Sequence, residues 1–164
     1  KIIDTNYKDW EDAININLLS SIIVTKLLLP DMIKKKWGRI INLTSTTAKE
    51  PAKLMSLSNV TRSGLVSFGK TLSKELSGTG ITVNNILTGG VLTDRLLSLV
   101  TLNSRNKKSQ LKYLLKKIEK SIPSNYLILP NEFAEIVLFL CSDKSNYING
   151  ISINIDGGSG NSIY

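Results

Sequence analysis

The sequence predicts an α/β fold built around a parallel sheet, and three observations support this. Short apolar runs of strand length alternate with longer segments whose apolar residues recur at helical spacing. The predicted order is helix, strand, helix, strand, helix, helix, strand, and strands separated by helices pair in parallel through right-handed crossovers. The chain has 164 residues, 41% of them hydrophobic and 21% charged, which is enough for one domain with a packed core.

The first helix is expected from residue 7 to about residue 36. Asn6 and Asp9 can cap its start, and Gly38 follows its end. Its apolar stripe consists of Trp10, Ile14, Leu18, Ile22 and Leu29.

Two strands and a second helix follow. Residues 39–45 form a short run that is apolar on both faces, which predicts a buried strand with a neighbour on each side. A strand preceding Lys1 would supply the missing neighbour. Residues 56–76 form the second predicted helix, which ends before Gly80. Residues 81–87 are the second predicted strand.

The last third of the chain is less regular at first. Residues 92–129 contain a basic helix at roughly 107–120 and then a loop. Residues 131–141 have helical apolar spacing, and residues 151–155 alternate as a strand does. The turn Asp156-Gly157-Gly158 ends this third strand.

Composition excludes several classes of site. The chain has no histidine, so histidine triads and histidine metal ligands are excluded, and with Cys141 as its one cysteine it has no internal disulfide. A reducing, cytoplasmic location fits this composition. The longest apolar run, residues 22–29, contains Lys26 and is far shorter than the roughly 18 residues of a membrane span, so no membrane partner is expected. The first residue is Lys1 rather than methionine, which favours an internal piece of a longer protein.

The net charge of +8 comes largely from two basic clusters. One is Lys34-Lys35-Lys36 with Arg39, and the other lies between residues 105 and 120. The first interpretation is that these are solvated helix ends. The second is attraction of an anionic partner such as an acidic carrier protein, a nucleotide or a phosphorylated substrate. Nucleic acid is not expected, because aromatic residues do not interleave with the lysines.

Several short segments, in this order and spacing, identify a family resemblance. They are Ile16-Asn17-Leu18, residues 38–45 (GRIINLTS), 80–84 (GITVN), 139–143 (FLCSD), 147–150 (YING) and 155–158 (IDGG). Together they resemble the short-chain dehydrogenase/reductase family, especially its beta-ketoacyl carrier-protein reductase branch. The resemblance implies a Rossmann-type doubly wound parallel sheet that binds NADP or NAD across the carboxyl ends of its strands.

The resemblance covers nearly the whole chain but not the family's first third. No glycine-rich phosphate loop opens any predicted helix. Residues 1–164 are therefore expected to form a single partial domain, with the N-terminal strands and the main dinucleotide-binding loop preceding Lys1. The residue that selects NAD or NADP would lie in that part, so the choice stays open.

The family's active site uses an asparagine, a serine, a tyrosine and a lysine. The resemblance places Asn17 at the asparagine, where it would hold a water for proton relay, and Ser45 at the serine, where it would bind the substrate carbonyl. The alternatives are an asparagine satisfied by a helix carbonyl and a serine that merely ends a strand. The tyrosine position, thirteen residues after Ser45, is Ser58, and the lysine position four residues later is Arg62.

These two replacements change the chemistry that the resemblance implies. The lysine cation normally lowers the pKa of the tyrosine phenol, so that the phenol trades a proton near neutral pH. The Ser58 hydroxyl is far less acidic and its side chain is shorter. Arg62 keeps the positive charge and could bind the nicotinamide ribose, but it stays protonated and cannot relay a proton. Among the tyrosines, Tyr126 lies in a loop that could approach the site, but it is not favoured as a stand-in.

After the second strand, the resemblance implies further cofactor contacts. Thr88 replaces the family's proline, while Gly89 and Thr93 match its glycine and threonine. Val91 would offer its backbone to the nicotinamide carboxamide, and Thr93 would contact the cofactor phosphates. The alternative for Gly89 is a plain turn residue.

The resemblance predicts an NAD(P)-dependent oxidoreductase that interconverts carbonyls and alcohols, similar to a 3-oxoacyl-ACP reductase. Its substrate would be a small carbonyl or alcohol, with an acyl-carrier-linked one among the options. The alternative is a catalytically impaired relative that binds a dinucleotide or a partner subunit, and a third possibility is a basic binding module. In either of the first two cases the long helices are expected to form a homodimer or homotetramer.

Overall fold

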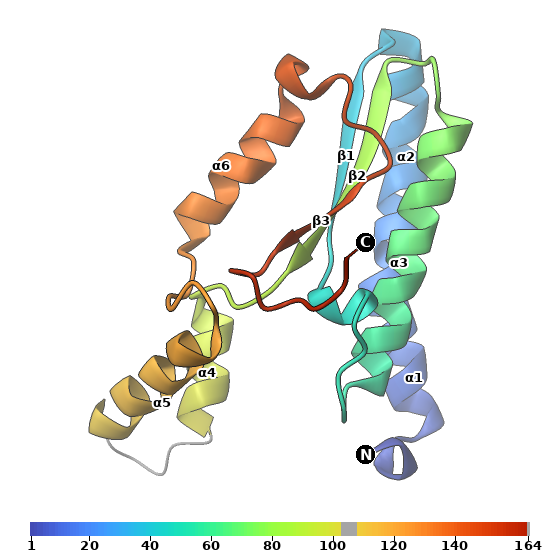
Figure 1. Cartoon of the computed structure of the whole chain (residues 1–164). Coiled ribbons are helices and arrows are strands. Elements are labelled where there is room, and N and C mark those ends of the chain that lie inside the picture. Colours follow the sequence, from blue (N-terminus) through green and yellow to red (C-terminus); the bar gives the residue numbers. More distant parts are fainter. Residues whose placement is uncertain (103–107, 164) are drawn as a thin grey trace.

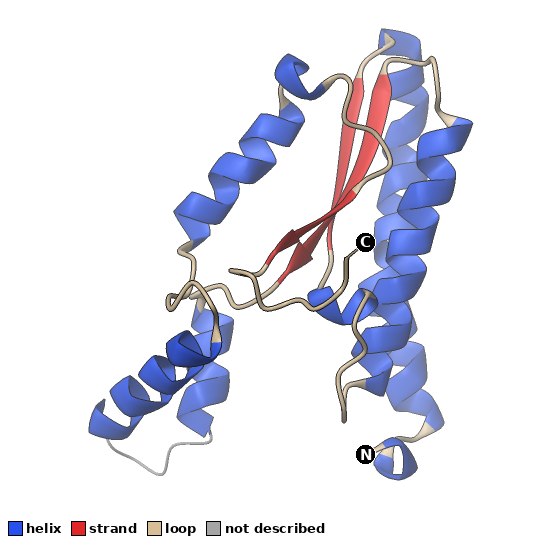
Figure 2. Ribbon diagram, viewed as in Figure 1, coloured by secondary structure: helices blue, strands red, loops and turns tan. Residues whose placement is uncertain are grey.

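The computed structural model describes residues 1–102 and 108–163, with side chains described outside residues 102–110. Its centre is a parallel sheet of β1 (Gly38–Leu43), β2 (Ile81–Thr88) and β3 (Ser152–Ile155) in that order (Figure 2). The predicted parallel α/β fold is therefore confirmed.

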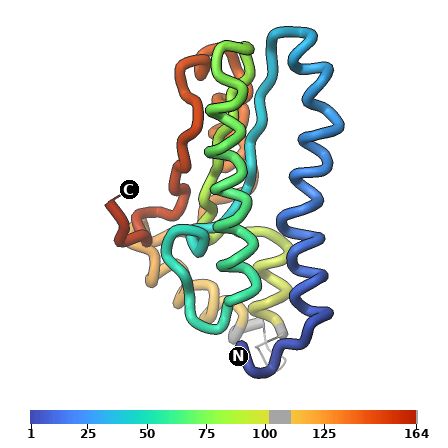
Figure 3. Tube along the Cα trace, turned by 90° about the vertical axis from the view of Figure 1, so that its right-hand side faces the viewer, coloured from blue at the N-terminus to red at the C-terminus, as the bar shows by residue number. Residues whose placement is uncertain are grey.

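Two long helical stretches cover one face of the sheet, lying side by side (Figures 1 and 3). The first runs through α1 (Tyr7–Ile14), a π-helical turn η2 (Asn15–Leu19) and α2 (Ser20–Lys35). The second is α3 (Ser56–Glu75). Between β1 and α3 lies a short 3-10 helix, η3 (Thr46–Ala48).

The other face of the sheet is covered by α6 (Pro130–Cys141), which leads through η4 (Asp143–Ser145) into β3. The helices α4 (Asp94–Leu102) and α5 (Lys108–Ser121) form a hairpin beyond the carboxyl ends of the strands (Figure 1). A 3-10 turn, η1 (Ile2–Asp4), precedes α1.

Each face of the sheet has its own apolar core. On the α2 and α3 side, a buried cluster consists of Ile40, Leu72, Leu76, Ile81 and Val83. On the α6 side, a second buried cluster consists of Ile86, Phe133 and Leu140. Because both faces are covered, β2 is buried from Ile81 to Leu87, as a central parallel strand requires.

The predicted elements are confirmed with small shifts at their ends, and one helix was missed. The strand expected at residues 39–45 ends at Leu43, because the chain turns into η3. The region expected to be irregular after residue 92 contains α4, so the predicted order was wrong by one helix. Thr93 caps α4 by accepting from the Leu96 N–H at 3.3 Å, and this is the local signal that could have revealed it. The predicted basic residues Arg105 and Lys107 lie outside the described residues.

One edge of β1 has no strand partner in the part of the chain that the structure describes. There β1 pairs with β2 alone, and the second neighbour, expected from a strand preceding Lys1, stays a prediction. The Leu43 side chain at its end is 48% exposed.

The stretch Tyr7–Lys35 is long and apolar enough to pass a simple test for a membrane span. It has 29 residues, a mean hydropathy of 1.6 in its most apolar window, and only 6% of that window is buried. One such helix is weak evidence, because a core helix of a soluble protein passes the same test. Its inner side packs on the sheet through Leu29 and Met32. The expectation of no membrane partner stays a prediction.

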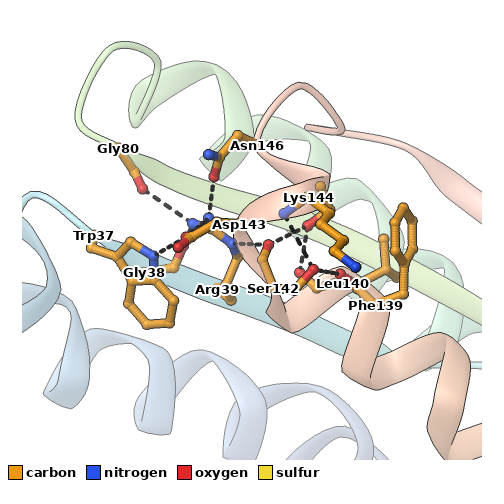
Figure 4. A network of polar contacts seen from close by, with 11 residues as sticks. Trp37, Gly38, Arg39, Gly80, Phe139, Leu140, Ser142, Asp143, Lys144 and Asn146 are labelled. Carbon is orange, nitrogen blue, oxygen red and sulfur yellow. Dashed lines mark hydrogen bonds and ion pairs between the residues drawn. The ribbon is translucent and has the colours of Figure 1, made fainter.

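At the amino ends of the strands, Arg39 joins the sheet to the segment after α6 (Figure 4). Its side chain is only 3% exposed. The guanidinium donates to the carbonyls of Gly38 at 2.8 Å, Gly80 at 3.3 Å and Ser142 at 3.4 Å. Arg39 was predicted to belong to a solvated basic cluster, and for this residue the prediction was wrong because three backbone carbonyls hold it inside.

Further contacts around Arg39 involve side chains (Figure 4). Its guanidinium pairs with the Asp143 carboxylate at 3.3 Å, and that carboxylate also accepts from the Trp37 indole N–H at 2.9 Å. The guanidinium lies 4.8 Å from the centre of the Trp37 ring and also donates to the Asn146 side-chain oxygen. Arg39 therefore links the starts of β1 and β2 to the α6 layer.

Candidate functional site

Asn17 and Arg62 meet where the long N-terminal helix widens. Asn17 lies in the π-helical turn η2, a distortion often found at functional sites. The Arg62 Nη2 donates to Asn17 Oδ1 at 3.4 Å, and Nη1 donates to the Leu43 carbonyl oxygen at 3.2 Å. The structure thus brings together two of the four predicted catalytic residues, and it fixes both next to the end of β1.

Arg62 is a partly buried cation. Burial lowers the pKa of its guanidinium from the usual value. A guanidinium nevertheless stays protonated in proteins, so it supplies fixed positive charge and directional N–H donors rather than a mobile proton.

Ser45 is held in the turn that follows β1. It caps η3, and its Oγ accepts from the Thr47 N–H at 3.2 Å and from Thr47 Oγ1 at 3.1 Å. Since both contacts bring donors to this oxygen, its own proton is left for another acceptor. The preceding residue, Thr44, is anchored to β2, with its N–H and Oγ1 bonded to the Ile86 carbonyl at 2.8 and 3.1 Å.

Ser58 lies in the first turn of α3, one turn before Arg62. Within the described residues its hydroxyl has no protein hydrogen-bond partner. It lines a cavity of about 240 Å³ with loop residues that include Leu54 and Met55. The structure therefore places Ser58 on the expected helix, and within the described residues its hydroxyl makes no hydrogen bond to Ser45 or Arg62.

The predicted cofactor residues share one cavity at the carboxyl ends of the strands. Its volume is about 450 Å³. Gly89, Val91 and Thr93 line it together with Leu43, whose carbonyl binds Arg62. The other lining residues are Thr88, Gly90, Arg95, Leu96, Leu99, Pro130 and Phe133. Arg95 was not predicted from the sequence, and it is the charged residue among these lining side chains.

Gly89 lies where the ends of β2 and β3 pack closely together. A Cβ atom on Gly89 would lie 2.7 Å from Asp156 Cα, and the Gly89 N–H donates to the Ile155 carbonyl at 2.9 Å. A side chain here would push the ends of β2 and β3 apart. Gly89 therefore packs closely at the strand ends and also lines the cavity, while its contact with a cofactor stays a prediction.

Thr88, which stands where the family has proline, makes a bond that links two strand ends. Its Oγ1 donates to the Thr44 carbonyl at 2.7 Å. A proline has no side-chain donor, so this link between the ends of β1 and β2 depends on the replacement. No sequence signal pointed to it.

Val91 and Thr93 each keep a group that can bind a ligand. The Val91 carbonyl already accepts from the Thr93 N–H at 2.9 Å, which leaves the Val91 N–H as its free backbone group in the described structure. Thr93 Oγ1 accepts from the Leu96 N–H, so its hydroxyl proton can still be donated. Tyr126 lines a second cavity, with Gly90 and Asp156, and is not among the residues that line the cavity of Gly89, Val91 and Thr93.

Comparison of the chain with known protein families assigns it to a family. Residues 1–160 match the family described as Enoyl-(Acyl carrier protein) reductase. The chain belongs to the short-chain dehydrogenase/reductase family. Its curated relatives in this family include the 3-oxoacyl-acyl-carrier-protein reductase FabG of Aquifex aeolicus, 34% identical over 150 residues, which are 92% of this chain and 56% of that protein. The D-beta-hydroxybutyrate dehydrogenase of Cupriavidus necator is 33% identical over 91% of this chain and 58% of that protein.

Solved structures of short-chain dehydrogenase/reductase proteins share the fold. The L-sorbose reductase of Gluconobacter frateurii, complexed with NADPH and L-sorbose, has a TM-score of 0.94 and 26% identity over 99% of this chain and 62% of its own. An actinorhodin polyketide ketoreductase with NADPH has a TM-score of 0.90 and 29% identity, over 99% of this chain and 63% of its own. The Rossmann-type expectation is confirmed. The chain spans between half and two thirds of the length of these relatives.

Proposed function

We propose that the full-length protein is a short-chain dehydrogenase/reductase that binds NADP or NAD and acts on a carbonyl or alcohol with an altered acid–base apparatus. The observation that carries this proposal is that the cavity at the carboxyl ends of the strands is connected to the pair of Arg62 and Asn17. Leu43 lines the cavity with Gly89, Val91 and Thr93, and its carbonyl holds Arg62 beside Asn17.

The residues present fit a nicotinamide cofactor. The cavity has an open glycine wall, a backbone N–H at Val91 and a hydroxyl donor at Thr93, which suit a carboxamide and a phosphate. Arg62 would hold the nicotinamide ribose. When bound, the cofactor supplies the hydride chemistry, and the protein supplies position and electrostatics. NADPH in the two similar solved structures supports NADP as the first candidate.

Residues of this chain would then bind and polarise the substrate carbonyl. Ser45, whose oxygen already accepts two donors, would donate a hydrogen bond to the substrate carbonyl and polarise it, keeping its own proton. Arg62 would contribute fixed positive charge near the developing alkoxide, without giving up a proton. The proton that a tyrosine normally delivers would come from water or from the substrate.

Substrate, partners and location are further parts of the proposal. The names of the FabG relatives support a small carbonyl substrate, with an acyl-carrier-linked 3-oxoacyl group as one option. The exposed apolar side of the stretch Tyr7–Lys35 supports a homodimer or homotetramer. We also propose a cytoplasmic protein in which residues 1–164 form part of one domain.

A catalytically impaired relative is the second candidate, and a specific observation favours it. The Ser58 hydroxyl makes no hydrogen bond to Ser45 or Arg62 in the described structure, so it does not reproduce the paired tyrosine and lysine of the family. Such a protein would bind a dinucleotide or a partner subunit without efficient turnover.

Titration of the full-length protein with NADPH and NADH, followed by nicotinamide fluorescence, tests the proposal. We expect saturable binding, and Arg62→Met should weaken it roughly tenfold because a charge-assisted hydrogen bond to the ribose is lost. Lys74→Met, at an exposed position in the last turn of the same helix, is the control and should leave the affinity unchanged. Absence of binding for both nucleotides would contradict the proposal.

A further inference from the structure

The segment after β3 is bound to the turn that carries Ser45. We call residues 159–162 the strap. In Figure 1 this red segment passes beside the short teal helix η3. Glu50 Oε1 accepts from the backbone N–H groups of Asn161 at 2.7 Å and Ser162 at 2.6 Å, and Oε2 accepts from Asn161 Nδ2 at 3.4 Å. One carboxylate thus receives three donors from the strap.

Glu50 belongs to the Ser45 turn through its backbone. Its N–H donates to the Thr46 carbonyl at 2.9 Å, directly after η3. Inside the same turn, the Thr47 N–H donates to Ser45 Oγ. Glu50 and Ser45 are therefore connected by a backbone bond to Thr46 and by a bond from the Thr47 N–H to the Ser45 side chain.

The strap is shaped to fit between two carboxylates. The Asp156 carboxylate accepts from the N–H groups of Gly158 and Gly160, both at 3.0 Å. A Cβ atom on Gly160 would lie 2.9 Å from Asp156 Oδ2 and 3.3 Å from Glu50 Oε1. A glycine at this position lets the backbone approach both acceptors.

The Ser45 turn is held from its other side by α3. Ser63 Oγ donates to the Ala48 carbonyl at 2.8 Å. The turn is therefore held between α3 and the strap, and the Glu50 carboxylate makes the contacts to the strap. Hydrogen bonds from the backbone and side chain of Ser162, and then from Asn161, hold the pKa of the Glu50 carboxyl below its usual value, so the acceptor is ionised at neutral pH.

We propose that Glu50 is a positioning residue: it ties the strap to the Ser45 turn and so sets the direction in which the Ser45 hydroxyl is presented. Glu50 is not among the residues that line the cavity of Gly89, Val91 and Thr93, so its effect would be exerted through Ser45. The functional part of this inference rests on the proposed role of Ser45. The tie between the strap and the turn is independent of that role and can be measured without catalysis.

The test is residue-resolved amide hydrogen exchange, measured by NMR on the full-length protein and its Glu50→Gln variant. Glutamine keeps the shape of the side chain but removes its charge, and charge-assisted hydrogen bonds are about twice as strong as neutral ones. We expect roughly fivefold faster exchange at Asn161 and Ser162, and a parallel increase at Thr47, whose N–H reports on the Ser45 turn.

The control is Glu132→Gln. Glu132 Oε2 accepts from the Leu129 N–H at 2.8 Å at the start of α6, so it loses a comparable bond away from Ser45. It should leave the Thr47 exchange rate unchanged. Ser162→Pro is the second variant, since it removes one N–H from the strap and keeps the Glu50 charge. It should reproduce the increase at Thr47.

Faster exchange at Asn161 and Ser162 with an unchanged rate at Thr47 would overturn the positioning role. Unchanged rates at Asn161, Ser162 and Thr47 in Glu50→Gln, together with unchanged rates at Asn161 and Thr47 in Ser162→Pro, would overturn the tie itself. NADPH titration of the same samples separates this result from the proposed function, because failure of the unmodified protein to bind NADPH would contradict that function and leave the exchange result standing.

Discussion

The double variant Ser58→Tyr/Arg62→Lys is expected to raise NADPH-dependent carbonyl reduction by the full-length protein about a hundredfold or more. Residues four apart on α3 share one helix face, so a tyrosine and a lysine at these positions would lie side by side. The lysine cation would then lower the pKa of the phenol, and a well-placed general acid contributes about 10² to 10⁴ in rate.

The single variants are the matched controls for this experiment. Ser58→Tyr alone keeps the guanidinium, and Arg62→Lys alone keeps the serine, so neither restores the full pair. Each is expected to reach only a small part of the gain, measured as kcat and kcat/KM with a panel of small ketones and 3-oxoacyl thioesters. If the double variant binds NADPH normally yet shows no gain, the cavity serves a different reaction or none.

Arg39→Met is expected to destabilise the protein by about 3 kcal/mol, because removing one member of a buried charged network leaves its partners unsatisfied. The Arg39 side chain is only 3% exposed. Its guanidinium donates hydrogen bonds to the carbonyls of Gly38, Gly80 and Ser142. The Asp143 carboxylate is 78% exposed, so water can replace the arginine there, and the loss comes mainly from the carbonyl contacts.

Urea unfolding of the full-length protein measures this loss. Lys34→Met, in the last turn of α2, removes a positive charge from an exposed position and should change stability by less than about 0.5 kcal/mol. Equal stability losses in the two variants would show that net charge, and not the network around Arg39, is responsible. Arg39→Lys should recover only part of the loss, because an ammonium cannot reach all the carbonyls at once.

The sequence predicted the elements whose apolar spacing is long and regular. The segment that became α3 and the buried run that became β2 were both found within one residue at each end. The helix α4 was missed because it has nine residues and its cap, Thr93, was assigned to cofactor binding. A single residue can cap a helix and line a cavity, and the sequence pattern does not separate these roles.

The sequence supplied the residues of the candidate site, but it did not supply the hydrogen bonds between them. The family motifs placed Ser45, Ser58 and Arg62 in register. The bond between Arg62 and Asn17 depends on the π-helical turn, which no apolar spacing reveals. The links from Thr88 to Thr44 and from Glu50 to Asn161 join residues far apart in the chain, so only the folded arrangement shows them.

A crystal structure of the full-length protein with bound NADPH tests the central claim most directly. We predict that the nicotinamide lies in the cavity lined by Gly89 and Val91, with the Arg62 guanidinium on its ribose and the Ser45 hydroxyl facing the ring. Electron density for the nicotinamide elsewhere, or a pocket from which both Ser45 and Arg62 point away, would contradict the account.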